Sequence, residues 1–165
     1  MCDLAMLGIQ ADPATAQILN DFCRSGCHVA SIKLQVKSMD ALKLACQRLG
    51  LEFCEGQTTY AWFGQSVGDY PLPEGFTQED LGKSSHAIHC PDAKYEIGVV
   101  FRDGAWRLLY DAWHTGGLEQ ALGKDLSRLR QGYGVEAAKL EAQRQGYSCW
   151  EEQLTDGAIK LHIQA

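Results

Sequence analysis

Aromatic and cationic side chains near predicted strand ends are the residues of this chain best suited to bind a ligand. Flat rings stack on planar groups, and the forked guanidinium of Arg107 suits carboxylates and phosphates. The same residue types dominate protein interfaces, and each tryptophan taken alone can equally fill the core. The residues predicted to bind a ligand are Lys33, Tyr60, Trp62, Arg107, Asp111, Trp113 and His114. The sequence predicts no catalytic residue.

Two carboxylates, Glu96 and Asp111, would face each other if the flanking strands pair as described below. Like charges placed so are destabilising unless they share a cation or retain a proton. Such a pair could serve as an acid and a base, or hold a cation. The alternative, which we favour, is that the strands separate after Gly98 and leave both acids in water.

The run from His86 to Cys90 contains two histidines and a cysteine, which are zinc-ligand types. On a strand, His89 points away from the other two, so the three cannot converge without a turn. A second group of such residues consists of Cys23, Cys27 and His28. Neither group has the spacing of a zinc finger or ribbon. The sequence therefore predicts no metal and no cofactor.

The seven cysteines allow a Cys–His nucleophile, but spacing alone does not show the lowered thiol pKa that such a nucleophile needs. We favour the interpretation that Cys46, Cys54 and Cys149 are small core residues. An odd number of cysteines without a framework spacing indicates free thiols in a reducing cytoplasm.

Size and charge exclude several classes of protein. A chain of 165 residues with 45% hydrophobic residues fits one globular domain. No apolar run approaches the ~18–20 residues of a membrane span, and the first residues lack the basic leader of a signal peptide. A net charge of −6 argues against nucleic-acid binding. The sequence predicts a cytoplasmic protein that binds neither nucleic acid nor membrane.

The element expected to organise the fold is a hairpin over residues 95–111, turning at Asp103-Gly104 as a two-residue type I′ turn. Its register places Phe101 opposite Trp106 and Val99 opposite Leu108, which makes one face a continuous apolar ladder facing the helices. A second hairpin turns at Asp156-Gly157 and places Trp150 opposite Ile163. In that register Glu152 lies opposite Leu161, so a bulge or a slipped register is the alternative.

The remaining elements complete an α+β domain. Alternation predicts a strand over 28–37, and helical spacing predicts a helix from Ser38 or Asp40 that Gly50 ends. A leucine-rich helix follows residue 117, and Gly132 and Gly134 are expected to kink or split it. We predict an antiparallel or mixed sheet with helices packed on one face and the polar reverse face partly open, in a ferredoxin-like layering.

Two segments lie outside this pattern. Residues 1–27 form an amino-terminal extension with a candidate strand over 4–9 and a helix starting at Asp12-Pro13, whereas 28–165 form the single α+β domain. Residues 66–85 are rich in glycine and proline and are predicted to be a long loop. Loops of this length are usually functional or mobile.

Several short motifs recur in order over residues 28–165. They are Ser31-Ile-Lys-Leu-Gln-Val36, Leu49-Gly50, Tyr95-Glu-Ile-Gly98, Tyr110-Asp111 with Trp113, Gln145-Gly-Tyr147 and Asp156-Gly-Ala-Ile-Lys-Leu161. In these motifs the chain resembles the cyanobacterial and plastid-encoded family called hypothetical chloroplast reading frame thirty-five, which has bacterial and phage relatives. The resemblance implies a compact α+β domain and no established activity. Residues 1–27 and the loop at 66–84 depart from the family pattern.

The absence of a convergent catalytic set favours a non-enzymatic accessory or interaction protein. Its expected contacts are the exposed sheet face, the long loop and the amino-terminal extension, with a protein partner or a second copy of the chain. The alternative is a module that binds or sequesters a small anionic or nucleotide-like ligand. A small enzyme that uses Glu96 and Asp111, or a Cys–His pair, is the third hypothesis.

Overall fold

The computed structural model of the protein describes residues 29–65 and 71–164. Its strands are β1 (Val29–Val36), β2 (Glu52–Cys54), β3 (His86–His89), β4 (Ile97–Arg102), β5 (Ala105–Asp111), β6 (Ser148–Gln153) and β7 (Ile159–Gln164). Its α-helices are α2 (Met39–Leu49), α3 (Leu118–Leu122) and α4 (Ser127–Arg144). Short 3₁₀ turns are η2 (Gln78–Asp80), η3 (His114–Gly116) and η4 (Lys124–Leu126). The predicted extension over residues 1–27 lies outside the described part of the chain.

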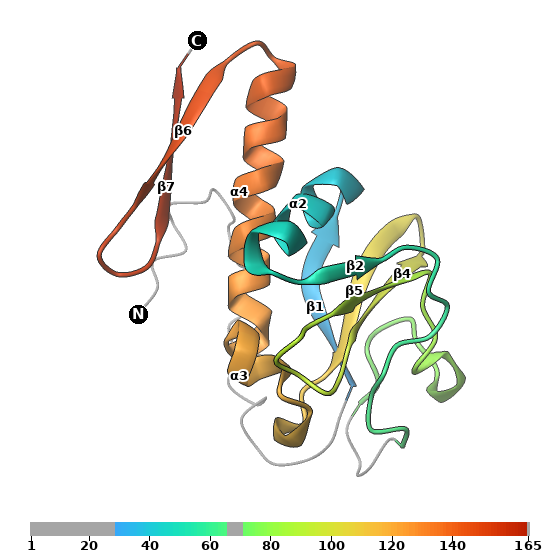
Figure 1. Cartoon of the computed structure of the whole chain (residues 1–165). Helices are drawn as coiled ribbons and strands as arrows, with labels where there is room; N and C mark the ends of the chain where they lie inside the picture. Colours follow the sequence, from blue (N-terminus) through green and yellow to red (C-terminus); the bar gives the residue numbers. More distant parts are fainter. Residues whose placement is uncertain (1–28, 66–70, 165) are drawn as a thin grey trace.

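The main sheet has five strands in the order β1-β5-β4-β3-β2, and every neighbouring pair is antiparallel. Helices α2 and α4 lie side by side against one face of it (Figure 1). This arrangement confirms the predicted α+β fold with helices on one face. The ferredoxin-like layering is not confirmed, because β1 and β2 flank α2 in sequence but lie at opposite edges of the sheet.

The central hairpin β4–β5 turns at Asp103 and Gly104, whose φ angles of 51° and 76° are those of a type I′ turn. The predicted register is confirmed, with Phe101 opposite Trp106 and Val99 opposite Leu108. Val99 and Leu108 are fully buried beneath the helices, whereas Phe101 is 53% exposed. The prediction that the helices cover the whole ladder is therefore wrong at its outermost rung, where only the half-buried Trp106 reaches the core.

Helix α2 begins and ends where the sequence predicts. Ser38 Oγ accepts a hydrogen bond from Ala41 N–H at 3.1 Å, which caps the first turn. Gly50, at φ 69°, takes the left-handed conformation that ends the helix. Tyr133 of α4 ties the two helices together, since its Oη accepts hydrogen bonds from the N–H groups of Lys37 and Ser38.

The break in the second helical segment lies earlier than predicted. Residues 123–126 separate α3 from α4, and Gly123, Asp125 and Leu126 all have positive φ. Helix α4 then runs unbroken through both of its glycines, so the predicted kink there is wrong. At Gly132 an added Cβ would lie 3.6 Å from Ala45 Cβ. Gly132 therefore faces α2, at a distance where a methyl group would make ordinary van der Waals contact.

The reverse face of the sheet is covered, in contrast to the predicted open face. Residues from the segment 58–82 pack on it, and Thr59 forms a bridge with Lys83. The buried members of this reverse-face core are Val29, Tyr60, Phe76, Leu81, Ala87 and Leu109. The predicted long loop thus supplies much of the cover, although its residues 66–70 lie outside the described part. An exposed face of this sheet is not available for recognition.

The carboxy-terminal hairpin β6–β7 forms a separate two-stranded sheet that stands beside α4, away from the main sheet (Figure 1). Its register places Trp150 opposite His162 instead of Ile163. Leu154 N–H donates to Ala158 C=O at 2.8 Å, and Gly157 has φ 84° while Asp156 has no positive φ. This three-residue loop ends in a glycine bulge and shifts the predicted register by one residue.

None of the helices in residues 29–65 and 71–164 combines the length and the apolar character that crossing a membrane requires.

Candidate functional site

Asp111 is a buried carboxylate at the end of β5, where it is 1% exposed. Its Oδ2 accepts a hydrogen bond from Phe63 N–H at 3.1 Å, and its Oδ1 accepts one from Trp113 N–H at 2.9 Å. A charge buried this deeply needs such partners to offset its lost hydration. Asp111 therefore joins the segment around Phe63 to the loop that follows β5.

Glu96 binds the same covering segment from the other side of the hairpin. Its Oε2 accepts hydrogen bonds from Ala61 N–H at 2.8 Å and from Gln57 Nε2 at 3.0 Å, while its own N–H donates to Ala61 C=O. Its Oε1 lies 3.7 Å from His89 Nδ1. Glu96 and Asp111, which we call the carboxylate clamp, together hold residues 57–63 against the sheet.

The predicted acid–base pair is thus replaced by the carboxylate clamp. Pairing of β4 with β5 ends at Gly98 and Leu109, and Asp111 lies opposite Val29 of β1. The predicted separation of the strands is confirmed, but the prediction that both acids lie in water is wrong. Backbone N–H groups of the covering segment donate hydrogen bonds to both acids. This segment lies outside the hairpin, so the residue pattern of the hairpin alone could not predict the contact.

Tyr60 and Trp62, two of the predicted ligand-binding residues, lie on the reverse face of the sheet. Tyr60 is 3% exposed, and a Cβ added to Gly98 would lie 2.6 Å from its Cε1. Burial raises the pKa of Tyr60 to about 12. Trp62 is half-buried against Gly82 and packs on the reverse-face core. Both side chains fill core space.

The other predicted ligand residues lie apart from one another. Arg107 Nη1 donates to Glu74 C=O at 3.3 Å near the β4–β5 turn. Trp113 and His114 follow β5, with ring centroids 4.8 Å apart. Lys33 lies in β1, and its side chain is outside the described part. Only Trp113 is joined to Asp111, through its N–H. A ligand-binding role for the seven residues stays a prediction.

The histidines of β3 have structural partners. His86 Nδ1 accepts a hydrogen bond from Gly56 N–H at 3.0 Å, and its ring lies between those of Phe53 and Trp106. Across residues 29–65 and 71–164, no group of three or more His, Cys, Asp or Glu side chains could hold a metal ion. The candidate group of Cys23, Cys27 and His28 lies outside these ranges.

Cys46 is expected to be unreactive in the folded protein. It is fully buried in α2, and burial raises its pKa to about 12. Because the thiolate is the nucleophile, its alkylation at neutral pH should be about a thousandfold slower than that of an ordinary thiol. Peptide mapping after a timed iodoacetamide pulse should show Cys149, which is half-buried, modified before Cys46. Equal rates at the two positions would contradict this burial.

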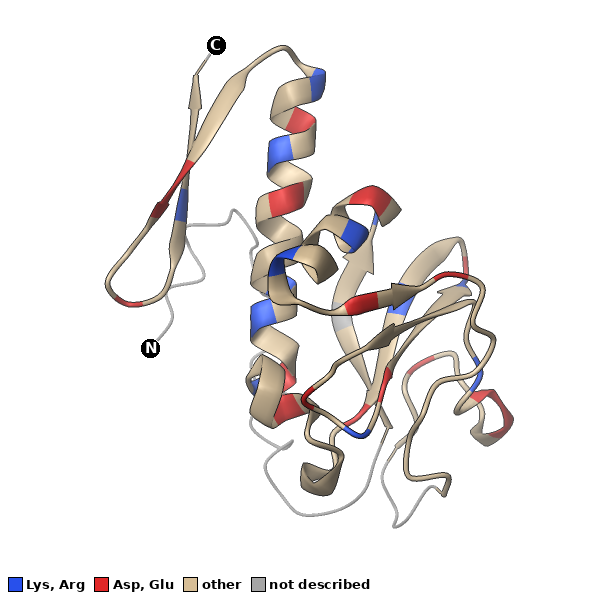
Figure 2. Cartoon of the chain, in the orientation of Figure 1, with Lys and Arg blue, Asp and Glu red and all other residues tan. Residues whose placement is uncertain are grey.

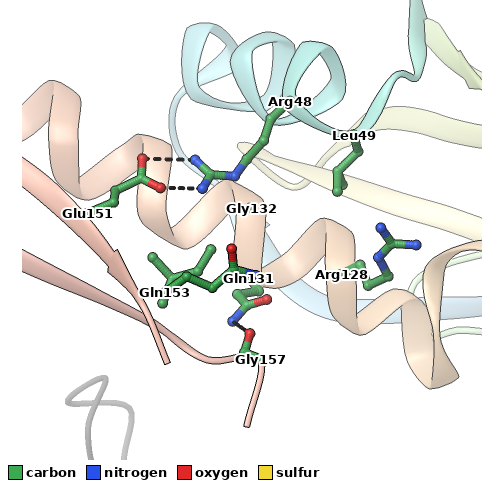
Figure 3. Close-up of a pocket in the computed structure, with 9 residues that line it drawn as sticks. Arg48, Leu49, Arg128, Gln131, Gly132, Glu151, Gln153 and Gly157 are labelled. Atoms are coloured by element: carbon green, nitrogen blue, oxygen red, sulfur yellow. Dashed lines mark hydrogen bonds and ion pairs between the residues drawn. The ribbon is translucent and has the colours of Figure 1, made fainter. Parts of the chain in front are cut away.

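A hollow of about 510 Å³ lies where α2, α4 and the β6–β7 hairpin meet (Figure 3). Helix α2 contributes its last turn, α4 its first half, and the hairpin residues of both strands and of the loop. The residues that line the hollow are Arg48, Leu49, Arg128, Gln131, Gly132, Glu151, Gln153, Gly157 and Ile159. Its walls are mainly polar, unlike the apolar lining of most small-molecule pockets.

One end of the hollow is an ion-pair network. Arg48 binds Glu151 through two nitrogens, and its Nη1 lies 2.7 Å from Glu136 Oε1. Lys139 Nζ lies 3.0 Å from Glu151 and 3.3 Å from Glu136. The hydrogen bonds from Arg48, with a smaller contribution from Lys139, lower the pKa of Glu151 to about 2. The network joins β6 to both helices and balances its own charge.

The other end of the hollow has hydrogen-bonding groups that no described residue uses. Arg128 Nη1 donates to Ala121 C=O at 3.0 Å, and Gln131 Nε2 donates to Gly157 C=O at 3.3 Å. The Gln153 amide makes no side-chain hydrogen bond within the described residues. Figure 3 shows both glutamines between Arg128 and the Arg48–Glu151 pair. These groups could bind a polar anion.

The outer face of the hairpin is a second exposed feature. The Trp150 and His162 rings stack with parallel planes at 4.9 Å, and His162 Nε2 lies 2.7 Å from Glu152 Oε2. Trp150 is 52% exposed on this face, whereas Ile163, which is 53% exposed, lies on the opposite face of the hairpin. Large apolar side chains are therefore available to a partner at the open end of this hairpin.

Sequence reasoning missed the residues of the hollow. Arg48 and Glu151 are 103 positions apart, and neither stands in a motif. The one local signal was glycine in the middle of α4 at 132 and 134, because an interior glycine often marks a close approach of two elements. It was interpreted as a kink.

Comparisons of the chain with protein-family models, with curated proteins and with solved structures found no match.

Proposed function

We propose that the protein acts by binding and not by catalysis, and that two copies of the chain associate through hairpin β6–β7. The carboxylates best placed for acid–base chemistry, Glu96 and Asp111, are engaged by backbone N–H groups. Because the reverse face of the main sheet is covered, hairpin β6–β7 replaces it as the proposed contact surface. The proposed membership of residues 28–165 in the hypothetical chloroplast reading frame thirty-five family, which implies no established activity, is consistent with a role in binding.

The outer edge of β7 carries the proposal. Among the described strands, β7 pairs only with β6, and no other described segment pairs with the backbone groups of its other edge. A two-stranded hairpin is marginally stable by itself, and an added strand would extend it. Along β7, the apolar residues Ile159, Leu161 and Ile163 alternate with Lys160 and His162.

This alternation is symmetric about Leu161, which suits antiparallel pairing of β7 with its copy. Centred on Leu161, such a pair would place Ile159 opposite Ile163 of the second copy, so that apolar side chains share one face. Lys160 would lie opposite the second copy's His162. Glu152 lies 3.6 Å from Lys160, so its negative charge offsets that of Lys160, and it lies 2.7 Å from His162 Nε2.

Sedimentation velocity over a range of concentrations tests the association. The wild-type chain is expected to show a reversible dimer. Ile163→Lys should weaken it at least about tenfold, because a charge would enter the apolar side of the contact. Ile163 is 53% exposed, so the substitution should leave the fold intact.

Phe101→Lys is the matched control, since Phe101 is also 53% exposed but lies at the β4–β5 turn. It should dimerise as the wild-type chain does. A wild-type chain that remains monomeric at every concentration, or equal losses in the two variants, would overturn the proposal.

A further inference from the structure

Arg128 is an uncompensated cation at the edge of the hollow. Within the part of the chain that the structure describes, it forms one hydrogen bond, to Ala121 C=O, and no ion pair. Arg48 and Lys139, by contrast, are balanced by Glu136 and Glu151. Among the described residues no acid pairs with Arg128, so its charge is available at the exposed edge of the hollow. Both acids of α4, Glu136 and Glu141, lie in its second half, whereas its first half has Arg128 and Arg130 and no acid (Figure 2), although the whole chain has a net charge of −6.

We infer that the hollow is a binding site for a small organic oxyanion, with a carboxylate or phosphate group held by Arg128. The planar guanidinium can donate two parallel hydrogen bonds to either group. Its Nη1 contact to Ala121 uses only one of its five donors. The site therefore selects for the charge and shape of an oxyanion.

The two glutamine amides define the rest of the ligand. With respect to the described residues, Gln131 retains its carbonyl oxygen, and Gln153 retains both its amide donors and its carbonyl. A ligand that continues from Arg128 past these amides meets acceptors as well as donors. Such a ligand needs hydroxyl, amide or ring N–H groups beyond its acidic group. A volume of about 510 Å³ suits a compound of mononucleotide size.

The wall opposite Arg128 sets a limit on the ligand. The Arg48–Glu151 pair closes that end, and its charges are already satisfied. A second acidic group placed there would have to compete with Glu151 for Arg48. The site is therefore expected to prefer ligands with one acidic end and a neutral polar end.

Titration of the ¹⁵N-labelled full chain tests this site, with AMP, gluconate and inorganic phosphate as the probes. AMP is expected to shift the side-chain amide signals of Gln131 and Gln153, which are assigned by their single alanine variants. Gluconate, with one carboxylate and a hydroxylated chain, shows whether a carboxylate serves as well as a phosphate ester, and inorganic phosphate shows how much the oxyanion alone contributes.

Arg128→Ala should weaken the binding of AMP about tenfold or more, as expected for the loss of hydrogen bonds to a charged group. Arg144→Ala is the matched control, because Arg144 lies on the same helix and pairs with Glu141 at its far end. It removes the same charge and should leave AMP affinity unchanged.

The proposal is overturned if none of the probes shifts the two amide signals, or if both arginine variants lose affinity equally. These outcomes are independent of self-association. The hollow lies within one copy of the chain, and its variants differ from those that test β7.

Discussion

Asp111→Ala is expected to lower the free energy of unfolding by about 2–5 kcal/mol. The substitution removes the acceptor for two backbone N–H groups, those of Phe63 and Trp113. Each unpaired donor costs about 1–3 kcal/mol where water cannot replace the partner. Urea unfolding followed by far-ultraviolet circular dichroism would measure the loss.

Asp111→Asn separates the hydrogen bonds of this residue from its shape. The amide oxygen can still accept from one N–H, whereas the amide nitrogen would face the other donor. An intermediate loss of about 1–3 kcal/mol is therefore expected. If Asp111 were kept for catalysis instead, its substitution would be expected to raise the free energy of unfolding, since functional sites often trade stability for activity. Variants as stable as the wild-type chain would contradict the structural role of the carboxylate clamp.

The two Asp-Gly turns show how far local sequence determines a hairpin. At residues 103–104 both positions take positive φ, and the flanking strands pair as the alternation predicts. At residues 156–157 only the glycine does so, and Asp156 Oδ1 instead accepts a hydrogen bond from Ala158 N–H. The same dipeptide fits a two-residue or a three-residue loop, so the register depended on neighbours that the dipeptide does not specify.

Contacts between distant segments explain the larger differences from prediction. The sheet face with Gly98 and Leu109 was predicted to be partly open, yet Tyr60, Phe76 and Leu81 cover it. The predicted loop that contains Phe76 and Leu81 lacks a helix or strand period, so these apolar residues gave no signal of packing. The hollow has the same origin, because its walls come from α2, α4 and the hairpin.

The helix boundaries show the opposite case, in which local chemistry decides. Ser38 caps α2 through its own hydroxyl, and Gly50 ends it with a positive φ. Neither requires a distant partner, and both were predicted. Glu96 and Asp111 instead required Ala61 and Phe63, which only the folded chain brings to them. Thus a candidate site can be identified by residue type while its role is decided by tertiary structure.

Gly98→Ala should destabilise the protein by about 1–3 kcal/mol, because it adds a methyl group where the Tyr60 ring already lies. Backbone strain is not the cause, since Gly98 sits in β4 without a positive φ. The cost should therefore depend on Tyr60. In a Tyr60→Ala background, the added methyl group should cost less than about 0.5 kcal/mol, and the coupling in this double-mutant cycle measures the contact.

Gly134→Ala is the matched control, and its expected effect has the opposite sign. Gly134 lies in α4 with no atom within 4 Å of an added Cβ, so alanine should stabilise the helix by about 0.5–1 kcal/mol. The same chemical change thus separates packing at the covered sheet face from helix propensity. A Gly98→Ala variant as stable as the wild-type chain would mean that Tyr60 does not lie on the sheet. The segment held by the carboxylate clamp would then leave the reverse face open to a partner, as the sequence alone predicts.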